Sequence, residues 1–313
     1  MEQGRINMRV ASALRQKISA YLELQSVKRH GSRLGRRWAP AYTKYLDRCR
    51  AKFIGDVDAP VEIERAARDF QKKGFATLWN ERTAELAETI FAKIQQEEKA
   101  GLNVWDADQR YHAEVYTKFP EIERLFRGPL GSFLRAVYKT HFKIFFGVLY
   151  KSERIQNGPS GSQLWHTDGG PGTCINVMFY LKDVSREDGA MECLPWDASL
   201  EIYRKELLSA EVHRRSRAVS AHTSERDVKC SFYLNEISES YRDRVEQPAG
   251  RAGLLLSFRN NILHKGGFPE PNRTRYVCVF HCYPSDRPTP FDRYATAGLP
   301  KKGSYPKDPA ADF

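Results

Sequence analysis

The stretch QLWHTDGGPGTCINVMFYLKDV, residues 163–184, places two potential metal ligands directly before an apolar run of strand length. His166 and Asp168 are two residues apart, and side chains at that spacing in a strand point to the same face of the sheet. The pair can therefore reach one metal ion together, with Thr167 turned away. The alternative is a polar corner where a strand meets its turn, and only ligands from elsewhere in the chain distinguish the two.

The sequence around this stretch predicts a core of short strands. Apolar runs of strand length recur from about residue 142 onward, and glycine- and proline-containing turns separate them. The runs cover residues 142–150, 173–182, 190–194, 253–258 and 275–282. No helical period passes through them, so we expect an all-β core at about residues 142–285.

Helices are expected before this core. Asp58 and Pro60 are helix start signals, and Gly74 is an end signal. Asn80 is a strong N-cap, and Gly101 ends the pattern that follows it. The expected helices cover residues 58–74, 80–101 and about 128–140, with the short strand FATLW after the first of them. The fold class is therefore mainly β with a helical N-terminal part.

Positive charge is concentrated at the start of the chain. Residues 1–52 hold thirteen Lys and Arg and three acids, so 13 − 3 = +10 of the net charge of +11 lies there. Such an arm suggests membrane lipid, a phosphorylated substrate or nucleic acid as partner, and the alternative is a solvated arm that aids solubility. We expect three parts: an arm at 1–55, helical or partly disordered, a domain at 56–290, and a loose tail at 291–313.

Nothing in the sequence predicts a membrane span or a secreted protein. No window approaches 18 apolar residues, and the N-terminus lacks the apolar core of a signal peptide. The six cysteines are scattered and contain no CxxC pair, which is typical of buried thiols in a reducing compartment. We expect a cytoplasmic protein, and the arm adds peripheral contact with the inner face of a membrane as an alternative.

A metal site needs a third ligand. Two histidines and one carboxylate form the facial triad that leaves open positions on ferrous iron. Of the eight histidines, His264 follows an apolar strand and precedes a Gly-Gly turn, as a ligand at a strand end would. His281, at the end of the last strand, is the main rival. Each histidine taken alone is more often a structural residue than a ligand.

Arg275 favours His264. It lies 275 − 264 = 11 residues later and opens the apolar strand RYVCVFHCY, where a buried charge needs an anionic partner. A guanidinium binds a carboxylate through two parallel hydrogen bonds. The alternatives are an internal salt bridge for Arg275, or anion binding by Arg273 in the polar turn PEPNRT.

The ordered pattern resembles a known enzyme family. A His-x-Asp pair, a histidine 264 − 166 = 98 residues later and an arginine eleven residues further resemble the Fe(II)/2-oxoglutarate-dependent dioxygenases. More closely, they resemble the phytanoyl-CoA dioxygenase family, which includes ectoine hydroxylase. The resemblance covers roughly residues 66–285. It rests on four segments in order: DFQKKGFATL, RIQNGPSGSQLWHTDGG, VMFYLKDVSREDGAMECLP and GLLLSFRNNILHKGG.

The resemblance implies a double-stranded β-helix, which is a jelly-roll or cupin-like core with packed helices. It also implies hydroxylation of a small-molecule, lipid or sugar-type substrate, with Fe(II), 2-oxoglutarate and O₂ as cofactors and succinate and CO₂ as co-products. Iron would be held by His166, Asp168 and His264, and Arg275 would bind the far carboxylate of 2-oxoglutarate. Gln156 and Asn176 match polar positions near the co-substrate. No catalytic residue beyond the metal ligands is implied.

The sequence also departs from the family pattern. Gly266 stands where the family commonly has serine, two residues after the distal histidine, and LPWDAS at 194–199 replaces a loop that borders the substrate. Substrate identity therefore stays open. Lys182, Lys265 and a polar, lid-like insertion at 203–227 are compatible with an anionic or lipid-linked substrate, or with ordinary solvated charge.

Three other functions compete with this interpretation. A non-catalytic cupin-like binding protein would keep the fold but is expected to lose part of the triad or Arg275. A zinc or manganese enzyme would use the same ligands, and metal analysis would distinguish it. Nucleic-acid binding through the arm is disfavoured, because no helix-turn-helix or interleaved aromatic motif accompanies the charge.

Overall fold

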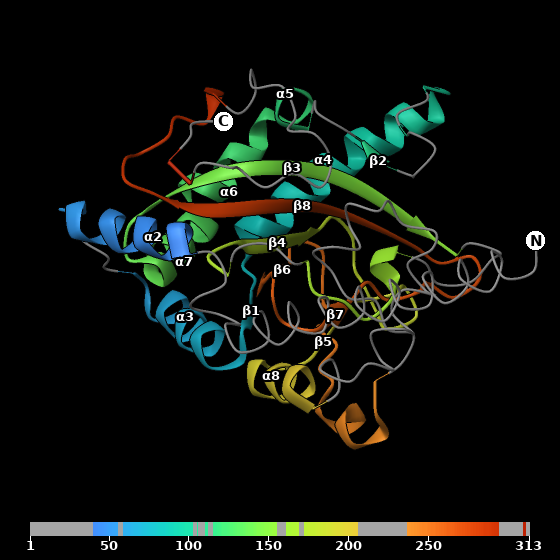
Figure 1. Cartoon of the computed structure of the whole chain (residues 1–313). Helices are drawn as coiled ribbons and strands as arrows, with labels where there is room; N and C mark the ends of the chain where they lie inside the picture. The colour runs from blue at the N-terminus through green and yellow to red at the C-terminus, as the bar shows by residue number, and fades with distance from the viewer. Residues whose placement is uncertain are drawn as a thin grey trace, which may run out of the picture.

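One antiparallel sheet of six strands organises the structure (Figure 1). The computed structural model describes residues 40–55, 59–102, 105, 110–111, 115–154, 161–168, 172–205, 237–293 and 309–310. The strands lie in the order β1-β6-β4-β8-β3-β2. Their bounds are β1 Phe75–Leu78, β2 Arg110–Tyr111, β3 His141–Glu153, β4 Ile175–Tyr180, β6 Leu255–Arg259 and β8 Thr274–Ser285.

A second, small sheet lies on the other side of the core from most of the helices (Figure 1). It pairs β5 (Glu192–Cys193) with β7 (His264–Lys265). Isolated bridges extend it on both sides, from His166 to His264 and from Cys193 to Glu246. A large and a small antiparallel sheet with crossing connections form the jelly-roll arrangement that the sequence predicts.

The two faces of the large sheet bury different residues because side chains alternate along each strand. On β8, Tyr276, Cys278, Phe280 and Cys282 pack into the apolar cluster that includes the helices. The alternate residues Val277 and Val279 pack into a separate cluster with Tyr180 of β4. Arg275 and His281 share the parity of this second set, so both belong to the face toward the small sheet.

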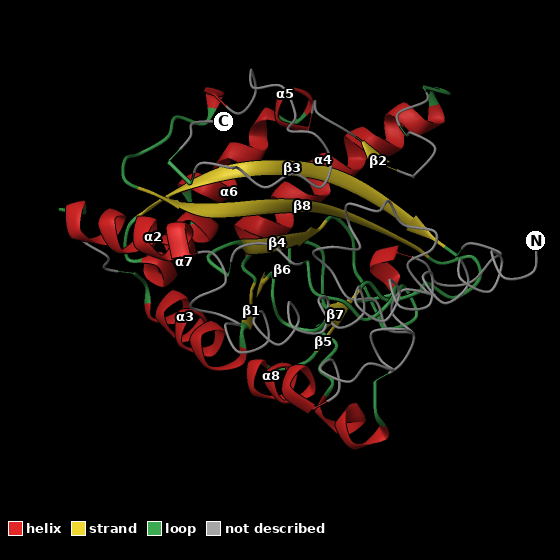
Figure 2. Ribbon diagram, in the orientation of Figure 1, coloured by secondary structure: helices red, strands yellow, loops and turns green. Residues whose placement is uncertain are grey.

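Most of the helices cover the outer face of the large sheet, which is the face turned away from the small sheet (Figure 2). The α-helices are α2 Pro40–Lys52, α3 Val61–Lys73, α4 Glu81–Lys99, α5 Val115–Lys118, α6 Glu123–Arg127, α7 Pro129–Tyr138 and α8 Trp196–Lys205. Short 3₁₀ turns occur at Pro120–Ile122, Gly161–Gln163 and Glu239–Arg244. The apolar cluster between the helices and this face of the sheet contains buried residues of α3, α4, α5, α6 and α7. None of the described helices is long and apolar enough to cross a membrane.

The predicted helix boundaries have clear local causes. Gly74 ends α3 in the left-handed conformation, with φ +84°, and its N–H donates to the Phe70 carbonyl. Asn80 begins α4 with a capping box, in which its side chain accepts from the Thr83 N–H while the Thr83 hydroxyl accepts from the Asn80 N–H. Both signals were readable in the sequence. Asp58 lies outside the described residues.

Residues 196–205 differ from the sequence prediction. The segment LPWDAS, expected as a loop, leads into α8, whose Ala198 and Ile202 are buried against Leu194. The Ser199 hydroxyl donates to the Leu194 carbonyl and ties the helix start to the preceding strand. An amphipathic helix with a buried face is therefore more stable here than an exposed loop.

Several predicted features lie outside the described residues. These are residues 1–39 of the arm, Gln156, all but the first three residues of the insertion at 203–227, and most of the tail. The last part of the expected arm is described, and it forms α2. Tyr42, Tyr45 and Cys49 are buried, and the helix contacts β8.

Candidate metal centre

The two candidate histidines lie opposite each other in a β-bridge. The His166 N–H donates to the His264 carbonyl at 2.8 Å, and the His264 N–H donates to the His166 carbonyl at 3.0 Å. Residues that exchange both backbone hydrogen bonds present their side chains on the same face. The two rings accordingly lie 4.3 Å apart between centroids, and both residues are buried.

Asp168 completes the cluster. Its N–H donates to the Asn260 carbonyl at 2.9 Å, which fixes the backbone after the bridge. Its Oδ1 lies 3.4 Å from His166 Nε2, and its Oδ2 lies 3.7 Å from His264 Nε2. One ligand atom from each residue lies within 4.8 Å of the others. The structure thus brings together the three residues that the sequence nominates, from segments 98 positions apart.

Both imidazole rings are oriented by their backbone. Nδ1 of His166 lies 2.7 Å from the Leu164 carbonyl, and Nδ1 of His264 lies 2.9 Å from the Ile262 carbonyl. A carbonyl oxygen can only accept, so each Nδ1 carries a proton, and Nε2 is the ring nitrogen that each histidine turns toward Asp168. A backbone carbonyl that accepts from the ring nitrogen facing away from the metal is the usual arrangement for a metal-ligating histidine.

The protonation states also suit a metal. Burial, together with the nearby His166, lowers the pKa of His264 to about 4. Burial by itself raises the pKa of Asp168, but the two histidines outweigh it and hold that pKa well below its usual range. A neutral imidazole and an ionised carboxylate are the forms that bind a cation.

Asn176 makes a contact that the sequence did not indicate. Its Nδ2 donates to Asp168 Oδ2, while its expected place near the co-substrate stays a prediction. Its Oδ1 accepts from the Cys174 thiol at 3.3 Å. Asn176 therefore orients the carboxylate of the cluster, and it is itself oriented by Cys174, two residues before it on the same face.

Replacing Asn176 by leucine is expected to lower the affinity for ferrous iron by about 10–100-fold, the usual effect of losing an outer-shell partner. Leucine keeps the volume but removes the donor that holds Asp168 Oδ2. Anaerobic metal titration measures the effect. Cys174→Ala, which leaves the Asn176 donor in place, serves as the milder comparison. Unchanged iron affinity in the leucine variant would contradict this role.

Arg275 is a buried cation without a carboxylate partner among the described residues. It is 4% exposed, one terminal nitrogen donates to the Gly189 carbonyl, and the other lies 3.5 Å from the Ser152 hydroxyl. Its Nε is buried with no hydrogen-bond partner in the described part of the chain. Burial lowers the pKa of Arg275, which expresses the cost of keeping this charge away from water.

The rival cation differs in each respect. The Arg273 side chain is 55% exposed and lies 3.9 Å from a carboxylate oxygen of Asp188. The internal salt bridge considered for Arg275 is thus formed, loosely, by Arg273. Of the two arginines, Arg275 is the buried one, and it has no carboxylate partner among the described residues.

The Arg275 guanidinium lies close to the metal cluster. A Cβ added to Gly266 would stand 3.5 Å from its NH2 atom, and Gly266 follows His264 by two residues. The guanidinium therefore lies against the backbone that follows the His264 ligand directly.

Two glycine turns form the wall around Arg275. Gly189 has φ +78°, and a Cβ there would come within 2.8 Å of the Gly267 carbonyl. A Cβ on Gly267 would come within 2.3 Å of the Ala190 carbonyl. Side chains at either position would push these two turns apart and remove the Gly189 carbonyl from Arg275. The sequence predicted both turns, but it did not indicate that the Gly189 carbonyl accepts a hydrogen bond from Arg275.

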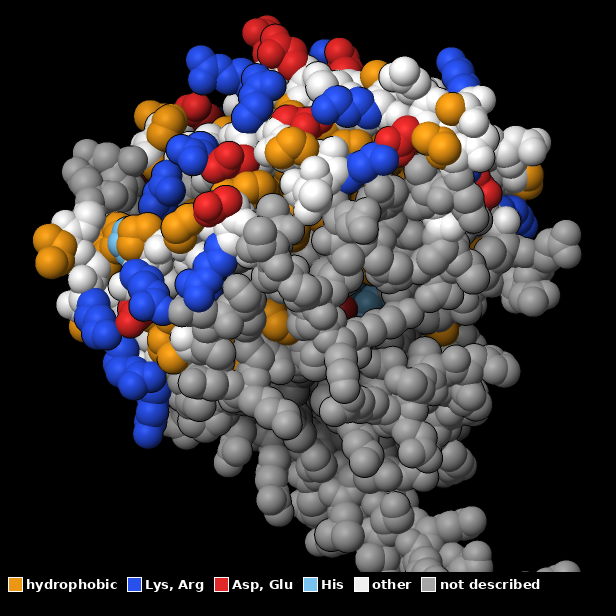
Figure 3. Space-filling model, turned by 90° about the horizontal axis from the view of Figure 1, so that it is seen from above, with side chains coloured by type: hydrophobic (Ala, Val, Ile, Leu, Met, Phe, Trp, Pro, Cys, Tyr) orange, Lys and Arg blue, Asp and Glu red, His pale blue; other side chains and the backbone are white. Residues whose placement is uncertain are grey.

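The two lysines that were considered for an anionic substrate both have acidic partners. Lys265 lies 3.0 Å from Glu192, and Lys182 lies 3.8 Å from Asp188. Seen from above, Lys and Arg side chains are interspersed with Asp and Glu over the described surface (Figure 3). The described body thus gives no further support for an anionic substrate.

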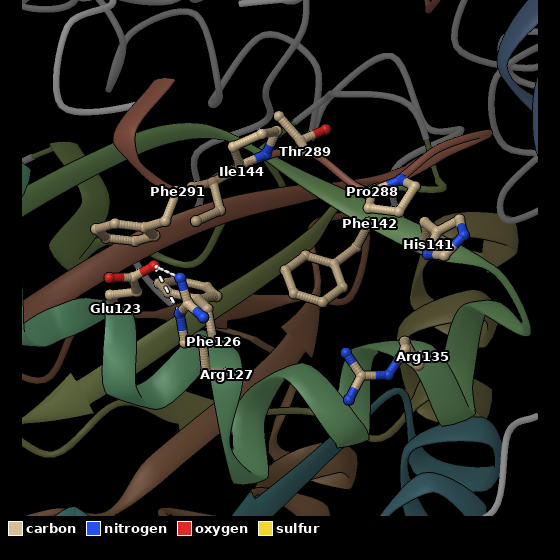
Figure 4. A pocket seen from close by; sticks show the side chains of 11 residues that line it. Glu123, Phe126, Arg127, Arg135, His141, Phe142, Ile144, Pro288, Thr289 and Phe291 are labelled. Carbon is tan, nitrogen blue, oxygen red and sulfur yellow. Dashed lines mark hydrogen bonds and ion pairs between the residues drawn. The ribbon is translucent and has the colours of Figure 1, made fainter. Parts of the chain in front are cut away.

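A separate cavity lies among the helices on the outer side of the large sheet (Figure 4). It has a volume of about 430 Å³, and Phe126, Phe142 and Arg135 are among the residues that line it. Arg127 in its wall is paired with Glu123 at 2.7 Å. No member of the metal cluster lines this cavity, so we assign it no part in the chemistry.

Comparison with known proteins supports the fold. The chain is similar to the epimerase SnoN, solved in complex with Fe³⁺, alpha ketoglutarate and nogalamycin RO. The TM-score is 0.53 at 16% sequence identity, covering 82% of this chain and 97% of SnoN. This similarity confirms the predicted mainly β, jelly-roll fold with packed helices.

Two further solved structures are similar at lower TM-scores. HygX from Streptomyces hygroscopicus, with nickel and 2-oxoglutarate bound, gives 0.49 at 14% identity over 70% of this chain and 86% of HygX. The non-heme alpha ketoglutarate dependent carbocyclase SnoK gives 0.45 at 16% identity over 73% of this chain and 88% of SnoK. No protein-family model matches the chain, and no curated protein sequence matches it.

Proposed function

We propose that the protein is an Fe(II)- and 2-oxoglutarate-dependent oxygenase that acts on a small molecule. One observation carries the proposal: near the cluster of His166, Asp168 and His264 lies Arg275, a buried guanidinium with no carboxylate partner among the described residues. A metal cluster alone would suit many enzymes and binding proteins. A cluster with a buried cation close to the backbone just after His264 suits a ligand that chelates at one end and carries a carboxylate at the other.

The residues fit ferrous iron. Two imidazole nitrogens and one carboxylate form the facial triad that leaves coordination positions open. A structural zinc site would use four protein ligands. Among the described residues, the cluster contains three.

The residues also fit 2-oxoglutarate. When bound, iron, 2-oxoglutarate and O₂ would supply an oxidation of the substrate coupled to decarboxylation of 2-oxoglutarate to succinate and CO₂. His166, Asp168 and His264 would hold the metal, and Arg275 would bind the distal carboxylate. Val277 and Val279 line the same face of β8 and keep this region apolar. The side chains therefore position the reactants and exclude water, and none is required as a general acid or base.

Hydroxylation and membership of the phytanoyl-CoA dioxygenase family are the finer parts of the proposal. SnoN, which shares the fold, is an epimerase whose structure contains nogalamycin RO. A small natural product is accordingly the substrate class that we would screen first. Mass analysis of the product decides the reaction, because hydroxylation adds one oxygen atom whereas epimerisation leaves the mass unchanged.

The proposal is tested without knowledge of the substrate. Fe(II) and then 2-oxoglutarate are added without oxygen, and a weak visible charge-transfer band is expected from the chelate. Succinate should then form slowly on admission of air. If iron binds but 2-oxoglutarate produces no band and no succinate, the cluster serves another metal or another role.

Contact of the basic arm with an anionic membrane, which would suit a lipid-linked substrate, is a further part of the proposal. Residues 1–39 hold nine Lys and Arg and two acids, a net 9 − 2 = +7. Deleting residues 1–39, which leaves the packed helix α2 in place, is expected to release the protein from phosphatidylserine vesicles. Succinate formation should be unchanged, since no proposed site residue is removed. Equal vesicle binding before and after deletion would reject the membrane role.

A further inference from the structure

Ser152 lies directly opposite Arg275 in the ladder between β3 and β8. Residues opposite each other in adjacent strands share a face, so the hydroxyl and the guanidinium point into the same space. The Ser152 Oγ lies 3.5 Å from Arg275 NH2. Within the described chain, Arg275 is the hydrogen-bond partner recorded for this hydroxyl.

The hydrogen-bond inventory leaves this pair incomplete. A hydroxyl has one donor and two acceptor positions, so accepting from Arg275 leaves the Ser152 proton free to donate. On the arginine, NH1 donates to the Gly189 carbonyl, whereas Nε has no partner among the described residues. Two donors at the same place, Arg275 Nε–H and Ser152 O–H, therefore have no acceptor among the residues that the structure describes. A carboxylate has two oxygens and only accepts, which matches this deficit.

Gly266 makes the position of Ser152 significant. A Cβ on Gly266 would lie 3.5 Å from Arg275 NH2, the same separation that the Ser152 Oγ shows from that atom. Gly266 contributes no side chain, so the hydroxyl beside the guanidinium comes from β3 instead. The β3–β8 register, rather than the turn after His264, supplies it.

We propose that Ser152 is a binding residue for the distal carboxylate of 2-oxoglutarate, to which it donates a hydrogen bond beside Arg275. This inference rests on the proposed function and adds a specificity residue to it. A 2-oxo acid whose far end carries a carboxylate, as 2-oxoglutarate does, gains the hydrogen bond from Ser152. A 2-oxo acid without that group, such as pyruvate, does not.

The test compares the two acids in three variants. Affinities for 2-oxoglutarate and pyruvate are measured anaerobically on the Fe(II)-loaded full chain by the charge-transfer band or by calorimetry. Ser152→Ala is expected to weaken 2-oxoglutarate binding by about 10-fold or more, as for a lost hydrogen bond to a charged group. Pyruvate binding should stay unchanged. Ser152→Thr keeps the hydroxyl and should restore 2-oxoglutarate affinity to within about threefold, since its main loss would be a small packing change.

Ser257→Ala is the matched control. Ser257 is a buried serine of the same sheet, opposite Val177, which belongs to the cluster under the helices. Its hydroxyl therefore faces away from Arg275, and its loss should change neither affinity.

The outcomes separate the inference from the function on which it rests. If the unmodified protein binds 2-oxoglutarate but Ser152→Ala binds it equally well, Ser152 has no such role while the proposed function stands. An equal loss for both acids would show a structural effect and would also overturn the inference. If the unmodified, iron-loaded protein does not bind 2-oxoglutarate at all, the proposed function fails and the role of Ser152 fails with it.

Discussion

Replacing His264 by alanine is expected to lower the affinity for ferrous iron by more than about 100-fold, beyond the range typical of an outer-shell partner. The change removes one of three ligand atoms that lie within 4.8 Å of one another. It also removes the nitrogen 3.7 Å from Asp168 Oδ2, so the carboxylate loses one of the two histidines of the cluster. Anaerobic titration with Fe(II), and with Co(II) as a spectroscopic substitute, measures the loss.

His281→Ala is the comparison that makes this prediction sharp. His281 lies opposite Asn176 in the β4–β8 ladder, and Asn176 contacts Asp168. Burial lowers the pKa of His281, and the negative charge of Asp168 partly opposes this shift. His281 is therefore close enough to Asp168 to feel its charge. Nevertheless, His281 is not a member of the ligand cluster. We expect its loss to change iron affinity little.

The opposite result would reassign the third ligand. If His281→Ala abolished iron binding and His264→Ala did not, the cluster would consist of His166, Asp168 and His281. Equal, small effects from both variants would indicate that the site does not bind iron through two histidines. Thermal unfolding of each metal-free variant shows whether a lost affinity reflects a lost fold.

The sequence predicted the features that depend on local spacing. His166 and Asp168 share a face because strand side chains alternate, and His264 was indicated by its place between an apolar strand and a Gly-Gly turn. Arg275 was indicated by its position at the start of a buried strand. Gly74 marked the end of α3 because glycine adopts the left-handed conformation without strain, and Asn80 marked the start of α4 because its side chain can accept from a free backbone N–H.

The features that escaped prediction depend on register and tertiary contact. Ser152 is significant only because β3 pairs with β8 in a register that sets it opposite Arg275. The hydrogen bond from Asn176 to Asp168 likewise depends on how β4 packs beside the segment that carries Asp168. Residues 194–199 were expected as a loop, but the buried face of α8 is defined by partners such as Ile237 and Leu263, which come later in the chain.

Charge was the least reliable guide. Lys182 and Lys265 suggested attraction for an anionic substrate, but each has an acidic partner in the folded chain. Arg273 and Arg275, two residues apart, have opposite environments because one lies before the strand and the other begins its buried part. Sequence alone cannot show which cation is neutralised, since acidic partners such as Asp188 come from distant turns.

Replacing Arg275 by methionine is expected to abolish 2-oxoglutarate binding while leaving iron binding intact. A bidentate, charge-assisted pair is lost, and two hydrogen bonds to a charged group at about 1.5–3 kcal/mol each correspond to a loss of more than about 100-fold. Lysine is a poor substitute, because its point charge cannot present two parallel donors. The iron affinity and the 2-oxoglutarate affinity are measured separately, under anaerobic conditions.

The same variant should be at least as stable as the unmodified protein when no ligand is present. A buried charge without an ionic partner is costly, so exchanging it for an apolar residue of similar volume is expected to be neutral or mildly stabilising. Saturating 2-oxoglutarate should reverse the order, because a ligand at 100 times its dissociation constant stabilises the unmodified protein by about 2.7 kcal/mol and cannot stabilise the variant. Thermal unfolding of both proteins with Fe(II), with and without 2-oxoglutarate, tests this crossing.

Arg273→Met is the matched control for this crossing. Its guanidinium is more than half exposed and only 3.9 Å from Asp188, so its removal should change the free energy of unfolding by less than about 0.5 kcal/mol. The stabilisation by 2-oxoglutarate should survive in this variant. If Arg273→Met loses that stabilisation and Arg275→Met keeps it, the anion site lies in the polar turn, and the buried guanidinium has a structural role. The expected result would instead mean that Arg275 is kept for its ligand, at a cost to the stability of the empty protein.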